Sequence, residues 1–484
     1  MTPPSSFSPG SHGVSGRATE RSADLVVLGA GPAGLAAAWR AALRGLSVVV
    51  LEKSDQVGGL AGSFEVDGIR VDYGSHRLNP ATDPAILDDL RGLLGDDLQT
   101  RLRSDRLRIG GSWVRYPLRG REVASALPPA MVRRAARDAV FAPVRRSDDS
   151  YAGVLRARVG PTLYDAVYGP WALKQWGLDG DAIAAEQARR RASVDRPWRF
   201  AAQLVGRRRR GGAPETFLYP RRGFGQLSDA LADAAVAAGA SMLTGAEVTR
   251  VHARTDGVRV EWDSGGLHAT QAFSTMPITT LGRVARPAPS VQAVQGAAGL
   301  FFRAMVLVYL VHEGGRWSQF DAHYLPDAPT PVTRVSEPTN YRSSADDPSD
   351  RSVVCAELPC RTGDATWAAD DATLASMVQE GLTAAGLPPV RLPSSGGVVV
   401  RRLPRFYPVY RQGYLERLAG IESWADRLAH VASFGRLGLF VHHNSHQAMR
   451  VAYDAVDCLG PDGVLDHVCW AAARDGRTAL SPSD

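Results

Sequence analysis

The pattern of aliphatic and polar positions from Asp24 to Glu52 is that of a β-α-β unit. The aliphatic run from Asp24 to Leu28 predicts a buried parallel strand. An alanine-rich segment then predicts a helix that ends near Arg44, and Val48 to Leu51 predicts a second buried strand. This order is that of a Rossmann fold, so an α/β class is the first expectation.

A glycine turn joins the first strand to the helix and reads GxGxxG at Gly29, Gly31 and Gly34. Gly29 permits a tight turn, Gly31 lets the backbone approach a pyrophosphate, and Gly34 lets the helix pack on the strand. The helix N-terminus offers free N–H groups to phosphates. Glu52 ends the second strand, where its carboxylate can accept ribose hydroxyls. The complete unit predicts a dinucleotide site.

Beyond this unit the periodicity changes several times. Hairpins are predicted at 64–78, around a turn at Asp67 and Gly68, and at 106–118, across Gly110 and Gly111. Residues 121–208 are mostly helical by spacing, and further helices are predicted at 84–94 and 226–238. Strands are expected at 247–252, 258–262, 302–310, 334–338 and 355–360, with a strand-like run after 435–436 and a final helix from 444–445 to about 458.

Composition narrows the function. The 484 residues, 44% of them hydrophobic, suffice for two domains. A net charge of +6 is mild for this length, so nucleic-acid binding is not expected, whereas an anionic small molecule fits. No apolar run approaches the roughly 20 residues of a transmembrane helix. Residues 1–22 are rich in Ser, Pro and Gly and predict a disordered leader, and we expect a cytoplasmic protein.

Cysteine and histidine spacing predicts no metal site. The four cysteines form no CxxC motif, and there are only 11 histidines. Reduced thiols are therefore expected at every cysteine, namely Cys355, Cys360, Cys458 and Cys469.

Three segments carry a resemblance to known flavoproteins. "KSDQVGG" places Gly58 and Gly59 just after Glu52, which resembles the flavoprotein extension of the Rossmann unit. "FEVDGIRVDYGSHRL" resembles the corresponding region of the FAD-dependent amine oxidase, protoporphyrinogen oxidase and phytoene desaturase group, and of UDP-galactopyranose mutase. "YGPWALKQWGLD" resembles the Y…K.WG segment of the mutase and its relatives. The resemblance implies that the cofactor is FAD.

The resemblance also implies a discontinuous architecture: a Rossmann-type FAD-binding domain, a mixed-sheet substrate domain and a helical lobe. Three parts of the chain would build the FAD-binding domain, at 23–100, 215–285 and 425–484. Residues 101–214 would form the helical and substrate lobe, and 286–424 the substrate-domain sheet. A C-terminal helix would point its positive end at the flavin.

Motif and resemblance together assign the site residues. Cofactor contacts are expected from Gly29, Gly31, Pro32, Ala33, Gly34, Glu52, Lys53, Gly58, Gly59, Leu60, Gly74, Ser75, His76, Val248, Gly435, Arg436, Asn444 and Ser445. Substrate contacts are expected from Lys174, Trp176, Arg405, Tyr407 and Tyr410. The catalytic candidates are His76, Tyr407 and His443.

Each of these assignments has a structural alternative. His76 can fix a loop by hydrogen bonds, and the histidines at 442, 443 and 446 can form a surface turn around a helix start. The tryptophans of 168–179 and the tyrosines of 405–414 can serve packing alone.

Two enzymatic hypotheses remain open. The favoured one is an oxidoreductase in which flavin N5 accepts hydride from a small, polar or sugar-containing intermediate. The other is a redox-neutral flavin-dependent sugar isomerase resembling the mutase. A non-catalytic FAD-binding protein is a third reading, and a homo-oligomer is compatible with all three.

Overall fold

The computed structural model describes residues 21–116, 127–141, 148–191, 215–327 and 329–478. The predicted leader lies outside these ranges except for its last two residues, Arg21 and Ser22. These two residues belong to the first strand, β1 (Arg21–Leu28), where they pair with β12. The strand thus begins three residues earlier than the aliphatic run indicated, because backbone pairing does not require an aliphatic side chain.

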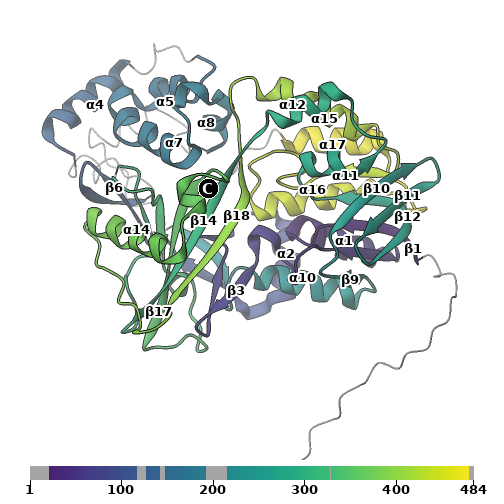
Figure 1. The fold of residues 1–484 in the computed structure, drawn as a ribbon, viewed down its shortest axis with the longest axis horizontal. Coiled ribbons are helices and arrows are strands. Elements are labelled where there is room, and N and C mark those ends of the chain that lie inside the picture. The colour runs from purple at the N-terminus through teal and green to yellow at the C-terminus, as the bar shows by residue number, and fades with distance from the viewer. Residues whose placement is uncertain (1–20, 117–126, 142–147, 192–214, 328, 479–484) are drawn as a thin grey trace, which may run out of the picture.

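An eight-stranded sheet forms the core of one half of the molecule (Figure 1). Its order is β13-β10-β11-β12-β1-β2-β9, and β19 also pairs with β12. β1 is parallel to β2 and to β12, as a Rossmann sheet requires, while β11 runs antiparallel to β10 and β12. The other strands are β2 (Val48–Leu51), β9 (Ser241–Leu243), β10 (Val248–Arg254), β11 (Gly257–Trp262), β12 (Gly265–Ser274), β13 (Ala285–Arg286) and β19 (Val431–Ser433).

Three helices from distant parts of the chain pack together on this sheet. α1 (Pro32–Leu43) contacts both α10 (Gln226–Ala237) and α16 (Ser445–Asp457), as Figure 1 shows. Its small residues Ala36, Ala37 and Ala38 are fully buried, which lets the neighbouring helices approach closely. The remaining helices of this half are α2 (Pro84–Leu94), α11 (Ile278–Val284), α12 (Val291–Ala298), α15 (Tyr414–Asp426) and α17 (His467–Thr478).

A seven-stranded mixed sheet forms the second half, in the order β18-β14-β17-β16-β15-β6-β7. Its longest strands, β14 (Phe301–Glu313) and β18 (Val398–Val409), run side by side between the two halves (Figure 1). The others are β6 (Asp105–Ile109), β7 (Ser112–Tyr116), β15 (Ala322–Tyr324), β16 (Arg334–Ser336) and β17 (Arg351–Cys360), with α13 (Ala365–Ala368) and α14 (Asp371–Ala384) beside them. Two short pairs, β3 (Ser63–Val66) with β4 (Ile69–Asp72) and β5 (Leu98–Leu102) with β8 (Thr216–Pro220), complete the strands.

A helical lobe lies over one end of the second sheet (Figure 1). It contains α4 (Pro129–Phe141), α5 (Tyr151–Val159), α6 (Pro161–Leu163), a π-helical turn (Tyr164–Tyr168), α7 (Gly169–Trp176) and α8 (Ala185–Arg191). Backbone hydrogen bonds from Ala184 to Tyr410 and from Gln412 to Ala182 attach the lobe to the end of β18. The predicted helical character of this region is confirmed in its described residues.

Two further expectations were wrong. The strand-like run after Gly435 is a series of turns, because Gly435 and Phe440 take positive φ angles of 83° and 52°; the strand β19 precedes it instead. Cys458 and Cys469 form a disulfide rather than reduced thiols. α16 and α17 pack against each other and bring the two Cα atoms to 5.6 Å, a proximity that the search for CxxC spacing could not detect.

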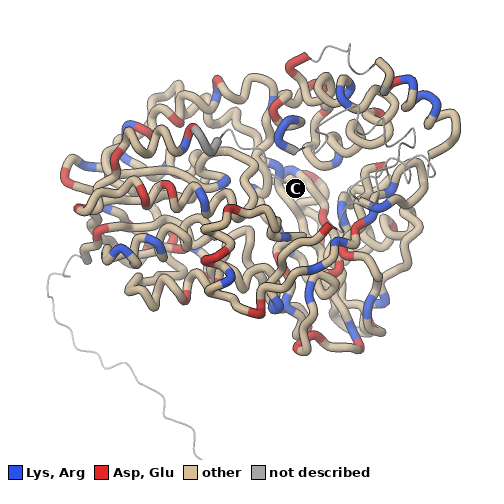
Figure 2. The backbone as a smooth tube through the Cα atoms, turned by 180° about the vertical axis from the view of Figure 1, so that it is seen from behind, with Lys and Arg blue, Asp and Glu red and all other residues tan. Residues whose placement is uncertain are grey.

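Within the described ranges, no helix has the length and apolar character needed to span a bilayer, and no group of three His, Cys, Asp or Glu side chains could hold a metal ion. In the view from behind, basic and acidic positions are interspersed over the half that contains the eight-stranded sheet (Figure 2).

Candidate functional site

The glycine turn after β1 has the geometry of a phosphate cradle. Gly29 has a φ of 109°, and a Cβ on Gly34 would lie 1.9 Å from the carbonyl oxygen of Gly29, so only glycine lets α1 sit this close to the turn. A Cβ on Gly31, in contrast, would meet nothing within 4 Å. α1 begins at Pro32, whose missing N–H costs nothing at this position. The N-terminus of α1 therefore opens onto free space beside Gly31.

Glu52 supports the turn from the end of β2. Its side chain is 7% exposed, and its carboxylate accepts hydrogen bonds from the backbone N–H of Ala30 at 2.8 Å and of Ser54 at 3.0 Å. The backbone N–H of Ala246 donates to the Glu52 carbonyl at 2.8 Å, which brings the start of β10 and Val248 to the same side. Lys53 is exposed beside them.

Two other chain segments complete the cradle. The N–H of Gly58 donates to the Ala30 carbonyl at 2.8 Å, and a Cβ on Gly59 would lie 3.5 Å from the Cα of Gly31. From the C-terminal part, a Cβ on Gly435 would lie 3.6 Å from the Cβ of Ala33. The open space at Gly31, ringed by three glycine segments, fits the pyrophosphate of a dinucleotide.

A loop from Gly74 to His76 follows β4 and is held from one side by Asp72. The buried Asp72 carboxylate accepts hydrogen bonds from Ser63 Oγ at 2.6 Å, Tyr219 Oη at 2.5 Å and the Phe224 N–H at 2.9 Å. Burial raises the pKa of Asp72 above its ordinary value. The Phe224 ring in turn stacks on His76, with 5.2 Å between the centroids.

The electrostatic surroundings of His76 keep its imidazole neutral. Burial, followed by the positive charges of Arg334 and Arg436, lowers its pKa to about 3. Its Nδ1 atom is buried without a hydrogen-bond partner among the described residues. A neutral imidazole cannot act as a strong acid near pH 7, but it can donate or accept one hydrogen bond to a bound group.

Aromatic side chains from three segments gather around Arg436. Its guanidinium lies 4.9 Å from the centroid of the Tyr407 ring. Trp176 of α7 meets Tyr407 edge-to-face at 5.4 Å and His442 at 5.5 Å. Gln187 of α8 lies within hydrogen-bond distance of His442 Nε2, at 3.0 Å. The structure thus brings together Trp176 and Tyr407, which the sequence assigned to the substrate, and Arg436, which it assigned to the cofactor.

The other predicted substrate residues are spread more widely. Lys174 donates to the Leu325 carbonyl, and burial lowers its pKa to about 8. Arg405 donates to Thr280 Oγ1 at 2.7 Å. Tyr410 is 1% exposed and stacks on Tyr414 at 4.4 Å, an arrangement that serves packing.

The C-terminal segment turns its polar residues inward. His443 is 2% exposed, and His446, whose pKa burial lowers to about 4, is 6% exposed. Both side chains are buried, so the alternative prediction that these histidines form a surface turn is wrong. Asn444 caps α16, with Gln447 completing a capping box, and Ser445 is the first helical residue.

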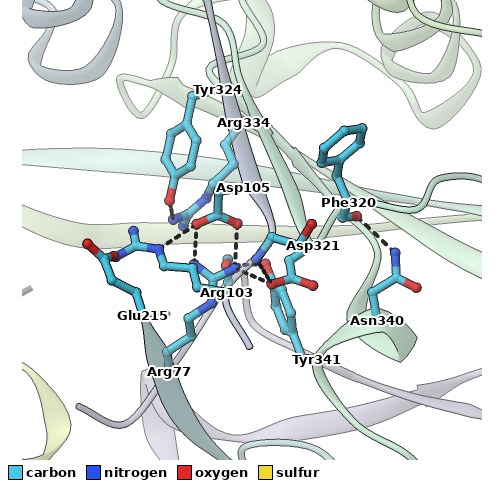
Figure 3. A network of polar contacts seen from close by, with 12 residues as sticks. Arg77, Arg103, Asp105, Glu215, Phe320, Asp321, Tyr324, Arg334, Asn340 and Tyr341 are labelled. Carbon is cyan, nitrogen blue, oxygen red and sulfur yellow. Dashed lines mark hydrogen bonds and ion pairs between the residues drawn. The ribbon is translucent and has the colours of Figure 1, made fainter. Parts of the chain in front are cut away.

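An ion network fixes the loop on its other side (Figure 3). Arg77, the residue after His76, donates twice to Asp105 at 2.6 Å, and Arg103 donates to the same carboxylate at 2.8 Å. Asp321 lies 3.5 Å from Arg77 and accepts the N–H of Ser104 at 2.8 Å. Asp105 begins β6 of the seven-stranded sheet and Asp321 directly precedes β15 of the same sheet, so this sheet positions the loop of the first half.

Sequence reasoning missed the members of this network, and it also missed Arg334 and Glu357. Arg334 donates to the Glu357 carboxylate on β17. The sequence held one signal for Glu357, because it is a single acid within the apolar strand "CAELPC" and a charge in a buried strand requires a partner. No sequence pattern pointed to Arg334 as that partner.

Comparison with known proteins agrees with this geometry. A family model described as an NAD(P)-binding Rossmann-like domain matches residues 27–93. Phytoene dehydrogenase from Streptomyces griseus is 41% identical over 83 residues, which make up 17% of this chain and only 16% of that protein. Reduced UDP-galactopyranose mutase superposes with a TM-score of 0.76 at 20% identity, covering 95% of this chain and 99% of the mutase.

The chain has the fold of UDP-galactopyranose mutase. A protein assigned as a protoporphyrinogen oxidase from Exiguobacterium sp. shares this fold, with a TM-score of 0.65 at 18% identity over 96% of this chain and 98% of that one. The mutase fold confirms the predicted class: a Rossmann-type dinucleotide-binding half built from separate chain segments, and a second half with a mixed sheet.

Proposed function

We propose that the protein is an FAD-dependent oxidoreductase that acts on a polar, sugar-containing small molecule. The observation that carries this proposal is the convergence of His76, Arg436 and Tyr407 beside the dinucleotide cradle. A cradle alone would suit either nicotinamide or flavin. A loop, an arginine and an aromatic wall from three other segments are what a second, larger ring system and its substrate would require.

FAD would supply the hydride acceptor at N5. The chain's own residues would bind and orient it. The α1 N-terminus and the glycine segments that end at Gly59 and Gly435 would hold the pyrophosphate, and Glu52 would accept the ribose hydroxyls. Val248 would lie on the adenine side. The positive end of α16 would stabilise negative charge on the reduced ring. His76 would offer a single hydrogen bond as a neutral imidazole.

The substrate would meet aromatic and cationic side chains. Tyr407 and Trp176 offer flat apolar faces suited to a sugar ring or a base, and Arg436 offers a delocalised charge. Lys174, which donates to the Leu325 carbonyl, would contribute a further positive charge at a distance from these rings. His443 is a candidate base, because it lies buried in the segment that carries Arg436.

A second candidate, a redox-neutral sugar isomerase, is favoured by one specific observation. The superposition on reduced UDP-galactopyranose mutase has a TM-score of 0.76 and covers nearly the whole of both chains. Such a reaction would use the same residues for binding, with the flavin returned to its starting state in each cycle.

Spectra of the purified protein distinguish the oxidoreductase from the isomerase. We expect yellow protein that retains FAD, with the flavin bleached by a hydride-donating sugar derivative without any other reductant. An isomerase would leave the flavin oxidised with every such compound, yet would convert a nucleotide sugar after dithionite reduction. Colourless protein that binds a nicotinamide dinucleotide and rejects FAD would overturn both candidates.

A further inference from the structure

Glu357 connects the loop that carries His76 with Arg334. It lies on β17, is 2% exposed, and its Oε1 atom accepts the backbone N–H of Ser75 at 3.1 Å. The same oxygen accepts Nε and Nη2 of Arg334 at 2.9 and 2.6 Å. A Cβ on Gly74 would lie 3.2 Å from this oxygen, which is a tight contact, and Gly74 has a φ of 90°, so glycine suits the loop at this point. One carboxylate oxygen therefore holds both the His76 loop and Arg334.

Arg334 needs this carboxylate because it lies deep in the protein. Its side chain is 16% exposed, and its Nη1 lies 3.5 Å from the Tyr324 hydroxyl. A buried guanidinium without an anion would be strongly unfavourable, and its charge would act over a long range in the low-dielectric interior. That charge already reaches His76, where it acts together with Arg436 against protonation.

We propose that Glu357 is a positioning residue that sets the reduction potential of the bound flavin, by cancelling the charge of Arg334 and by fixing the Ser75 backbone beside it. This inference rests on the proposed binding of FAD. Reduction adds negative charge to the flavin, so a nearby uncompensated cation favours the reduced form and an uncompensated anion disfavours it. With Glu357 in place, the pair carries no net charge, so the effect of Arg334 on its surroundings is partly offset, and Arg436 and the α16 N-terminus supply the remaining positive charge.

Three variants separate charge from shape. Glu357→Gln keeps the acceptor for the Ser75 N–H but leaves Arg334 unbalanced. Arg334→Met leaves Glu357 unbalanced, and the double variant removes both charges. We expect Glu357→Gln to favour reduced over oxidised flavin about tenfold, a rise of about 30 mV for a two-electron couple. Arg334→Met should shift the potential by a similar amount in the opposite direction, and the double variant should return to within threefold of the wild type.

A matched control is available in the same sheet region. Glu337 is also a fully buried glutamate, which accepts the backbone N–H groups of Trp317 at 3.1 Å and Ser318 at 2.8 Å. Glu337→Gln should leave the potential unchanged. Thermal midpoints, measured alongside, show how far each variant is destabilised, but a purely structural role for Glu357 would not produce shifts of opposite sign in the two single variants.

The potential is measured spectrophotometrically on FAD-loaded protein against reference dyes. Shifts of the same sign in both single variants, or no shift in Glu357→Gln, would refute the role of Glu357. Should Glu357→Gln fail to fold, the opposite shift in Arg334→Met and its reversal in the double variant decide the question. A wild-type protein that binds no FAD would instead refute the proposed function, so the two failures are distinguishable.

Discussion

Two neighbouring glycines provide a sharp test of the cofactor cradle, because the structure gives them opposite surroundings. Gly31 has φ −78° and ψ 176°, a conformation open to any residue, and its missing Cβ faces free space. Gly34 faces the carbonyl oxygen of Gly29 at a distance that no Cβ tolerates. We therefore expect Gly31→Ala to fold normally but to bind FAD poorly, and Gly34→Ala to damage the fold itself.

The magnitudes follow from these distances. A Cβ on Gly34 would stand about 1 Å inside the closest approach of real Cβ atoms, and such overpacking costs about 1–3 kcal/mol of folding free energy. In Gly31→Ala the same kind of clash would arise only with the bound pyrophosphate. A cost of about 1–3 kcal/mol there corresponds to a dissociation constant for FAD that is roughly 5- to 150-fold higher.

Thermal unfolding of the apoproteins and FAD titration by flavin fluorescence separate the two effects. Apo Gly31→Ala should melt at the wild-type temperature or slightly above it, because alanine reduces the entropy of the unfolded chain. Apo Gly34→Ala should melt several degrees lower. The reasoning fails if Gly31→Ala binds FAD as tightly as the wild type, or if the two apoproteins melt together.

Further predictions concern the disulfide, a buried acid and the central histidine. Reduction of the Cys458–Cys469 disulfide, whose cysteines are 11 residues apart, should destabilise α17 by about 2–3 kcal/mol and lower the melting temperature of the protein. A double Cys→Ser variant should melt at the temperature of the reduced wild type, with or without dithiothreitol. Burial raises the pKa of Asp321 to about 6, so the native state loses stability as the pH rises from about 4 to 6. In urea unfolding, the free energy of unfolding of Asp321→Asn relative to the wild type should therefore increase with pH, by at most about 3 kcal/mol. ¹⁵N NMR should show His76 as a neutral imidazole from pH 5 to 9, because its pKa is about 3, and a titration near pH 6.5 would contradict the described charge environment.

The sequence was informative wherever structure depends on neighbours along the chain. The strand, glycine turn and helix of residues 24–44 could be predicted because burial of each element leaves its own periodicity. The turn at Asp67 and Gly68 was equally visible, since both residues take positive φ angles, 51° and 74°, which this dipeptide tolerates.

Contacts between segments that are distant in sequence could not be predicted from the sequence. Glu357 meets Ser75 across 282 positions, and Arg77 meets Asp321 across 244. These pairs depend on how two sheets are set against each other, which no local pattern encodes. The disulfide was missed for the same reason. The turn after Gly435 was missed because its apolar residues are buried by the tertiary fold without being paired in a sheet, so they resemble a strand in sequence.

The placement of the His76 loop explains why the two halves of the molecule are interleaved. The contacts that fix this loop reach other parts of the chain. Asp72 ties it to β8 and to the turn before α10, Arg77 ties it to β6, and Glu357 ties it to β17. Two of these three anchors, β6 and β17, belong to the seven-stranded sheet. A change in that sheet, such as a substrate bound against β16 or β18, would therefore act on the residues beside the cofactor cradle without any rearrangement of the Rossmann half. The charge pair of Arg334 and Glu357 lies at this point of contact, so under the proposed function it is where substrate binding in one half would affect the flavin held by the other.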